Sequence, residues 1–305
     1  MAKKKTSKKR KTRKVKNKIN FKLLVLVILL ILLTGVAIFI NFQKNKTLPE
    51  TEKTEVKILP KEASKKLLYA STSASFKIPI LMYHYVEYVQ DKKDKTRQAL
   101  NINPYIFEQQ VITLKNAGYT FITAKDLGDV FDGKKQMPQK PVLLTFDDGH
   151  WDLYTDVLPI LKKYNVKATA YIITNYLDGS DFLSTDQLLK LSSSGYFEIG
   201  SHTLNHVWLK GRGSQQVQNE VQKSKKILED LIKKPVVSFA YPYGAFDQQA
   251  EDIVKNSGYE TAVITVPGVI DSVVNRYFLF RLRPGGRIGN ELLYYLEQTT
   301  FRPWE

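Results

Sequence analysis

The sequence of 305 residues contains no cysteine, and this absence excludes several kinds of protein. Without cysteine there is no disulfide framework, no Cys-x-x-Cys redox or zinc-ribbon site, no thiol nucleophile and no lipidated cysteine anchor. Histidine is nearly as scarce, with four residues, so any histidine-based site has few candidates. Acidic residues are missing before Glu50.

The net charge of +16 is concentrated near the N-terminus. Twelve basic residues precede residue 23, Lys44 and Lys46 add two more, and the remainder holds 32 basic and 30 acidic residues. A nucleic-acid-binding domain needs a basic face on its folded part, and a nearly neutral remainder gives no sign of one. We therefore expect no nucleic-acid partner and interpret residues 1–22 as a basic cytoplasmic tail.

Residues 23–43 have the length and composition of a membrane anchor. They carry no charge, and most are aliphatic. About 20 helical residues span a bilayer core of roughly 30 Å, and this apolar run exceeds the roughly 7–15 residues of a cleaved signal peptide. Because positive charge precedes it, we expect one uncleaved transmembrane helix, with the N-terminus in the cytoplasm and everything beyond about residue 43 outside the cell membrane.

Residues 44–75 are interpreted as an extracellular stalk, and residues 76–305 as one folded domain. In this domain, apolar or β-branched runs alternate with helix-like segments. The expected strands are 78–83, 119–122, 142–146, 168–173, 197–200, 236–241, 261–266 and 278–282, and the expected helices are 105–117, 124–131, 152–164, 185–193, 215–232 and 247–257. This alternation predicts the α/β class, as a distorted (β/α) barrel of seven to eight units with its chemistry at the carboxyl ends of the strands.

Ionisable residues follow two of these strands. Asp147 and Asp148 come directly after the strand 142–146, and adjacent carboxylates are unfavourable unless a cation compensates them. His202 and His206 follow the expected strand 197–200. On a helical turn, their spacing of four residues lets both imidazoles bind one ion. A solvated loop or a helix cap explains the first pair alone, but the two pairs together indicate a metal site.

A third group follows the expected strand 236–241. Tyr243 stands between a proline and a glycine, which impose an irregular backbone and could direct the Tyr243 N–H into a site as an oxyanion donor. Taken alone, a turn with packed aromatic rings explains this segment equally well.

These motifs together resemble the NodB-type polysaccharide deacetylases, carbohydrate esterase family four, over about residues 76–285. Thr145–Gly149 (TFDDG) looks like the first family motif, and Ser201–His206 (SHTLNH) looks like the second. Pro79–His84 (PILMYH) resembles the N-terminal strand of the subgroup that includes the poly-β-1,6-N-acetylglucosamine deacetylases of biofilm matrix.

The resemblance implies roles for individual residues. Asp147 would be the catalytic base, and Asp148, His202 and His206 would bind a divalent metal ion. An Asp-His-His set suits Zn, which we expect first, and also Co or Ni.

The sequence departs from the family pattern in two places. Ala240 stands where many members carry an arginine that contacts the base, and Arg281 or Arg283 could supply that charge instead. No histidine follows His206, so the general-acid histidine that the family commonly has near the C-terminus is missing, and His84 and His150 are the candidates for its role. We expect His84, because it ends the first strand.

The resemblance implies a metal-dependent N-deacetylase that releases acetate from N-acetylglucosamine units of a cell-surface polysaccharide, either poly-N-acetylglucosamine or peptidoglycan. An O-acetyl polysaccharide esterase and a non-catalytic glycan-binding or adhesion protein on the same fold are the alternatives. A monomer is assumed, held to the membrane by its N-terminal helix. Four aromatic residues beside the motifs are candidates for stacking on sugar rings or for packing: Tyr85, Tyr88, Trp151 and Trp208.

Overall fold

The computed structural model describes residues 77–91, 93–270 and 275–298. The predicted tail, anchor and stalk lie outside the described residues. Among the helices of the described part, none combines the length and the hydropathy that a membrane span requires.

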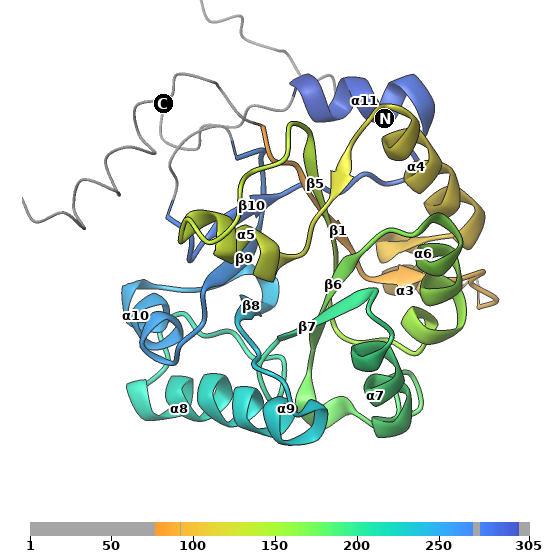
Figure 1. Cartoon of the computed structure of the whole chain (residues 1–305). Helices are drawn as coiled ribbons and strands as arrows, with labels where there is room; N and C mark the ends of the chain where they lie inside the picture. Colours follow the sequence, from red (N-terminus) through yellow and green to blue (C-terminus); the bar gives the residue numbers. More distant parts are fainter. Residues whose placement is uncertain (1–76, 92, 271–274, 299–305) are drawn as a thin grey trace, which may run out of the picture. The chain divides into compact units, whose positions relative to one another are not determined.

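Seven parallel strands form a nearly closed barrel (Figure 1). In ring order they are β1 (Ile80–Tyr83), β5 (Pro141–Phe146), β6 (Ala168–Ile172), β7 (Phe197–Ser201), β8 (Ser238–Ala240), β9 (Thr261–Pro267) and β10 (Leu279–Arg281). Two backbone hydrogen bonds of 2.8 Å join β10 back to β1, from Met82 N–H to the Leu282 carbonyl and from Leu282 N–H to the Ile80 carbonyl. The predicted (β/α) barrel is therefore confirmed, with seven strands.

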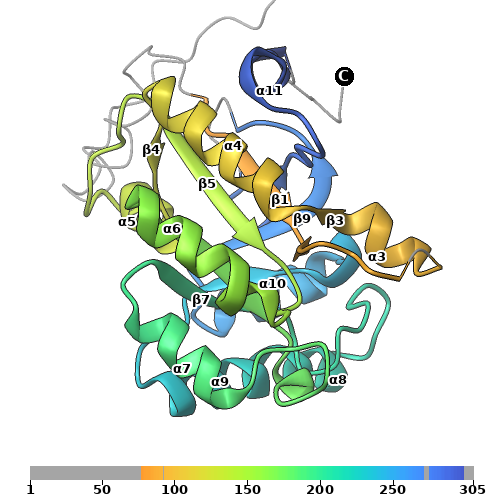
Figure 2. The same cartoon turned by 90° about the vertical axis from the view of Figure 1, so that its right-hand side faces the viewer.

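Helices cover the outside of the barrel (Figures 1 and 2). They are α4 (Pro104–Asn116), α5 (Ala124–Phe131), α6 (Leu158–Tyr164), α7 (Thr185–Ser193), α8 (Ser214–Gln218), α9 (Ser224–Ile232), α10 (Gln248–Asn256) and α11 (Gly289–Gln298). α5 and α7 have the predicted bounds because each begins with a capping box, at Thr123 and at Ser184. α4 packs against both α6 and α11.

Two predicted helices are interrupted by a wider, π-helical turn. The expected helix 152–164 has such a turn at Leu153–Val157 before α6 begins. Pro159 lies in the first turn of α6 and has no N–H, so regular α-helical hydrogen bonding cannot run through it. The expected helix 215–232 has a second π-helical turn, Asn219–Lys223, between α8 and α9.

The remaining differences concern short elements. The expected strand 119–122 forms β4 (Thr120–Phe121), which pairs with the start of β5 and is not part of the ring. The sequence analysis missed β2 (Tyr85–Val86), β3 (Asn101–Ile102), α3 (Lys95–Leu100) and α11. Two-residue strands have no periodicity to detect, yet β2 and β3 pair beside the carboxyl end of β1 and shape one side of the site.

Gly200 on β7 marks a very close approach inside the barrel. A Cβ atom at this position would lie 2.5 Å from Oγ of Ser238 and 2.5 Å from Cδ1 of Tyr171. Both neighbours are fully buried, so neither has free space to move into. The absence of a side chain at Gly200 therefore makes room for the Tyr171 ring.

We expect Gly200→Ala to lower the free energy of unfolding by about 1–3 kcal/mol, because the added methyl overpacks the barrel. Thermal unfolding of the full chain measures this change. Gly213→Ala is the control, since a Cβ there meets nothing within 4 Å. Equal melting temperatures for the two variants would contradict the packing argument.

Candidate active site

The predicted site residues gather at the carboxyl edge of the barrel, where parallel strands end together. Asp147 and Asp148 directly follow β5, His202 follows β7, and His84 follows β1. Arg281 is the last residue of β10, which the ring closure brings beside β1.

Asp147 is held by a buried, two-pronged ion pair with Arg281. Nη1 and Nη2 of the guanidinium each donate a 2.7 Å hydrogen bond, to Oδ1 and Oδ2 respectively. Asp147 is 2% exposed and Arg281 is fully buried. Burial alone would raise the pKa of Asp147, but the charge of Arg281 and its hydrogen bonds bring that pKa below its usual value. Of the two candidate arginines it is Arg281 that contacts Asp147, whereas Arg283 is exposed.

Asp148, His202 and His206 form a cluster able to hold a metal ion. Oδ1 of Asp148 lies 3.5 Å from Nε2 of His202 and 3.4 Å from Nε2 of His206, and the three ligand atoms lie within 4.8 Å of one another. This carboxylate oxygen is buried, and none of the residues that the structure describes gives it a hydrogen bond. Nδ1 of His202 donates to the Ala240 carbonyl at 2.8 Å, so in the neutral ring it is Nε2 that carries the lone pair facing Asp148. Acceptors that face one another fit a bound cation.

The backbone that presents these ligands is not the helical turn that the spacing predicted. Thr203 and His206 have positive φ angles of 67° and 54°, and Oγ1 of Thr203 accepts a 3.0 Å hydrogen bond from the His206 N–H. Asp148 also has a positive φ, 75°. Non-glycine residues seldom adopt this conformation, and its occurrence at all three sites is typical of a functional loop.

His84 lies beside the two carboxylates with its side chain partly exposed. Burial lowers the pKa of His84 below its ordinary value, while the charges of Asp147 and Asp148 oppose that change. The charge of Arg283 adds to the lowering. A histidine in this environment is neutral more readily than a free one.

His150, the other candidate acid, is enclosed by packing. Its ring is 3% exposed and lies between Tyr85 and Phe182, with ring centroids 3.9 and 4.9 Å away. Nδ1 donates to the carbonyl of Asp181 at 3.1 Å, and Nε2 lies 3.4 Å from Oδ2 of Asp148. Tyr85 therefore packs against His150.

Tyr243 lies at the rim of the site with an exposed ring and a strained backbone. Its φ is 59°, and its ring centroid lies 4.5 Å from that of His206 and 5.7 Å from that of the exposed Trp208. Gly244 is required beside it, because a Cβ there would lie 2.8 Å from the backbone nitrogen of Thr265. Within the described part of the chain, nothing accepts a hydrogen bond from the Tyr243 N–H.

Asp152 is a structural residue of the site that the sequence analysis treated only as the start of a helix. It is 1% exposed, and Oδ2 accepts a hydrogen bond from the Val86 N–H. This bond fastens β2, and with it the segment that follows His84, to the loop that follows Asp148. Burial raises the pKa of Asp152 to about 6.

One edge of the barrel thus carries a carboxylate paired with an arginine, a histidine and a cluster able to hold a cation. Residues 134–262 match the family model described as polysaccharide deacetylase. YxkH of Bacillus subtilis (strain 168), assigned by name to the polysaccharide deacetylases, is 31% identical over 247 residues, which cover 81% of this chain and 85% of that protein. The chain therefore belongs to the polysaccharide deacetylase family and is a hydrolytic deacetylase.

Two further relatives agree with this assignment. A poly-beta-1,6-N-acetyl-D-glucosamine N-deacetylase of Staphylococcus epidermidis is 29% identical over 220 residues, which cover 65% of this chain and 74% of that protein. The structure of the deacetylase PplD of Streptococcus pyogenes, solved in complex with acetate, matches with a TM-score of 0.67 and 28% identity, over 75% of this chain and 100% of that chain.

We expect Arg281→Met to lower the free energy of unfolding by about 3–5 kcal/mol, because it leaves the Asp147 carboxylate buried without its partner. Adding Asp147→Asn in the same chain should recover part of this loss, since the unpaired charge is then gone. Chemical unfolding of both variants measures the difference. Arg283→Met is the matched control on the same segment and should leave stability nearly unchanged. A double variant no more stable than Arg281→Met would contradict this account.

Proposed function

We propose that this protein is a metal-dependent N-deacetylase that removes acetyl groups from N-acetylglucosamine units of a cell-surface polysaccharide. The observation that carries the proposal is the Asp147–Arg281 ion pair next to the cluster of Asp148, His202 and His206. One carboxylate is kept ionised by an arginine, and its neighbour faces two imidazoles. These are the parts needed to activate water for attack on an amide.

Asp148, His202 and His206 would hold the ion through Oδ1 and two Nε2 atoms. A divalent cation supplies Lewis-acid chemistry when bound, by polarising a carbonyl group and lowering the pKa of a water molecule. The donor set of one carboxylate and two imidazoles suits Zn first, with Co or Ni as alternatives.

Asp147 acts in this proposal as the general base. Its pKa is held low by Arg281, so the carboxylate is ionised at neutral pH and can accept the proton of the attacking water. The Tyr243 N–H would stabilise the oxyanion that forms on the acetyl group, because a preorganised amide donor stabilises developing charge. The positive φ of Tyr243 and its unengaged N–H support this role.

His84 acts as the general acid that protonates the departing glucosamine nitrogen. It is partly exposed, so substrate can reach it, and the charges of Asp147 and Asp148 favour the protonated ring that an acid needs. His150 is less suited to this step, because its Nε2 is buried and points at Asp148. Its place supports a role in orienting that carboxylate.

The substrate and the location are proposed from the relatives and the sequence. The name of the S. epidermidis relative favours poly-N-acetylglucosamine, and peptidoglycan is the rival glycan. The apolar segment 23–43 would anchor the protein in the cell membrane, with the catalytic domain, residues 76–305, outside. Each deacetylation would expose an amine that is cationic at neutral pH and so change adhesion of the surface polymer.

We expect the full-length chain, purified in detergent, to release acetate from poly-N-acetylglucosamine when Zn²⁺, Co²⁺ or Ni²⁺ is supplied. Chelation should abolish release, and added metal should restore it. The variant Asp148→Asn, in which a neutral amide replaces the ligand carboxylate, should lose bound metal by elemental analysis while remaining folded. Peptidoglycan, chito-oligomers and O-acetylated polysaccharide tested in parallel identify the substrate. No acetate from any N-acetylated glycan, with a folded and metal-loaded protein, would refute the proposal.

We expect His84→Ala to reduce kcat by about 10²–10⁴-fold, the usual contribution of a general acid. Metal content should stay at the wild-type level, because His84 does not belong to the ligand cluster. His150→Phe, which keeps an aromatic ring between Tyr85 and Phe182, is the comparison variant and should chiefly weaken metal binding. Unchanged turnover in His84→Ala would rule out His84 as the acid.

A further inference from the structure

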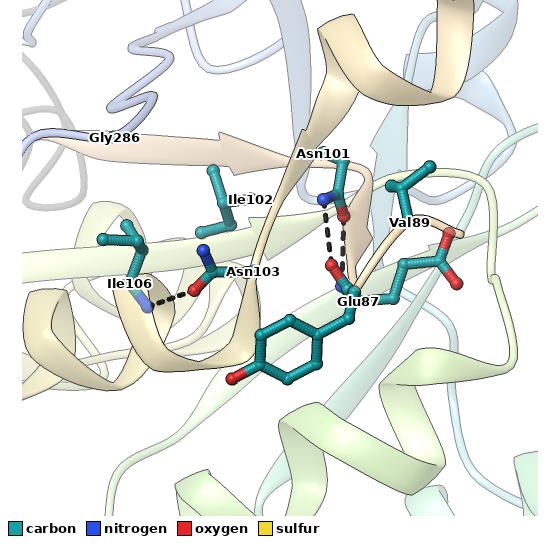
Figure 3. Close-up of a pocket in the computed structure, with 8 residues that line it drawn as sticks. Glu87, Val89, Asn101, Ile102, Asn103, Ile106 and Gly286 are labelled. Carbon is teal, nitrogen blue, oxygen red and sulfur yellow. Dashed lines mark hydrogen bonds between the residues drawn. The ribbon is translucent and has the colours of Figure 1, made fainter. Parts of the chain in front are cut away.

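A pocket of about 410 Å³, drawn in Figure 3, has none of the proposed catalytic residues in its lining. One wall begins at Glu87, directly after β2, and so continues the segment that carries His84. The opposite wall contains Gly286, five residues beyond Arg281. Because both walls extend segments of the active site, the pocket lies beside that site. Its volume is within the usual range for small-molecule sites, about 300–1,000 Å³.

The first wall is fixed in place by hydrogen bonds. The side-chain amide of Asn101 accepts from the Glu87 N–H at 3.0 Å and donates to the Glu87 carbonyl at 2.9 Å, as Figure 3 shows. Arg97 pairs with Glu87 at 2.9 Å and with Asp181 at 3.1 Å. The Asp181 carbonyl in turn accepts from His150, so this wall is bonded to the catalytic cluster.

The second wall is fixed by Gln110, a fully buried residue of α4. Its Nε2 donates to the carbonyls of Gly285 and Arg287, at 2.7 and 2.8 Å, on either side of Gly286. Its Oε1 accepts a 3.0 Å hydrogen bond from the hydroxyl of Tyr83, the last residue of β1. The pocket is therefore formed before any ligand arrives, which lowers the entropic cost of binding.

The lining of the pocket suits a neutral sugar. Tyr88 is 61% exposed and offers an aromatic face, while Ile102 and Ile106 add apolar surface. Oδ1 of Asn103 accepts from the Ile106 N–H at 2.9 Å, but among the described residues no acceptor takes a hydrogen bond from its Nδ2 (Figure 3). The lining carboxylate, Glu87, is already paired with Arg97. An aromatic face, a free amide donor and no unpaired charge match an uncharged pyranose ring.

We propose that this pocket is a subsite for an N-acetylhexosamine unit adjacent to the one being deacetylated, with Tyr88 stacking on its ring and Asn103 donating a hydrogen bond to one of its oxygens. The inference rests on the proposed function. Tyr88 lies four residues beyond His84, so at about 3.6 Å per residue the pocket is within about 14 Å of the proposed acid. One polysaccharide chain can occupy both places, and the enzyme should therefore prefer oligomers to single units.

Two variants test the subsite with little risk to folding. Tyr88→Ala removes the exposed ring, and Asn103→Asp removes the Nδ2 donor while keeping the oxygen that caps α4. We expect each to raise KM for β-1,6-linked N-acetylglucosamine pentamer about three- to tenfold, with kcat nearly unchanged. Turnover of a small acetyl ester, 4-methylumbelliferyl acetate, should stay at the wild-type level because this substrate does not reach the pocket. Tyr294→Ala, another exposed tyrosine, is the matched control.

Calorimetric binding of the same pentamer to the metal-free full-length chain separates this inference from the proposed function. Weaker pentamer binding by Tyr88→Ala and Asn103→Asp than by Tyr294→Ala would support the subsite even if no acetate were released. Wild-type KM and wild-type binding in both pocket variants, with acetate still released, would overturn the subsite and leave the proposed function standing.

Discussion

The site depends on one constraint: two adjacent carboxylates, one buried and one half-buried, each need a partner that compensates their charge. Asp147 and Asp148 follow one another at the end of β5, and two like charges in a protein interior repel strongly. Arg281 compensates the first with two hydrogen bonds, whereas the second faces His202 and His206 and has an oxygen without a partner. Because the two carboxylates have different partners, they are suited to different chemical roles.

Closure of the barrel supplies the first of these partners. Arg281 is on β10, and β1 lies between β10 and β5 in the ring. The hydrogen bonds that join Leu282 to β1 fix the backbone next to Arg281, and its Nε also donates to the Ile264 carbonyl at 2.9 Å. Ala240, where the resemblance to the family leads us to expect an arginine, instead accepts a hydrogen bond from His202 through its carbonyl. Arg281 can reach Asp147 from another strand because the strands end at the same edge of the barrel.

Much of this arrangement could be predicted from the sequence, and the exceptions have physical causes. The long elements carry periodic patterns and caps, so α5 and α7 were predicted to the residue, and the ligand cluster followed from strand ends. The turn between His202 and His206 could not be predicted, because residue spacing reports proximity but not backbone conformation. The choice between Arg281 and Arg283 also needed the structure, since it depends on which side of a strand end faces the interior. Asp152 gave no signal, because its function is a hydrogen bond to the backbone of β2, an element with no sequence pattern.

Side-chain hydrogen bonds and ion pairs also fix the pocket walls beside the cluster of Asp148, His202 and His206. Tyr83, the last residue of β1, bonds through Gln110 to the segment around Gly286, while Asp181 links the ring of His150 to Arg97. These links involve side chains and join residues far apart in the sequence, and the one between Tyr83 and Gln110 is buried. These links hold the pocket walls, whereas the barrel itself is held by the backbone hydrogen bonds between its strands. A change in these linking residues would change the shape of the pocket. The same barrel and the same catalytic groups could then act on different polysaccharides.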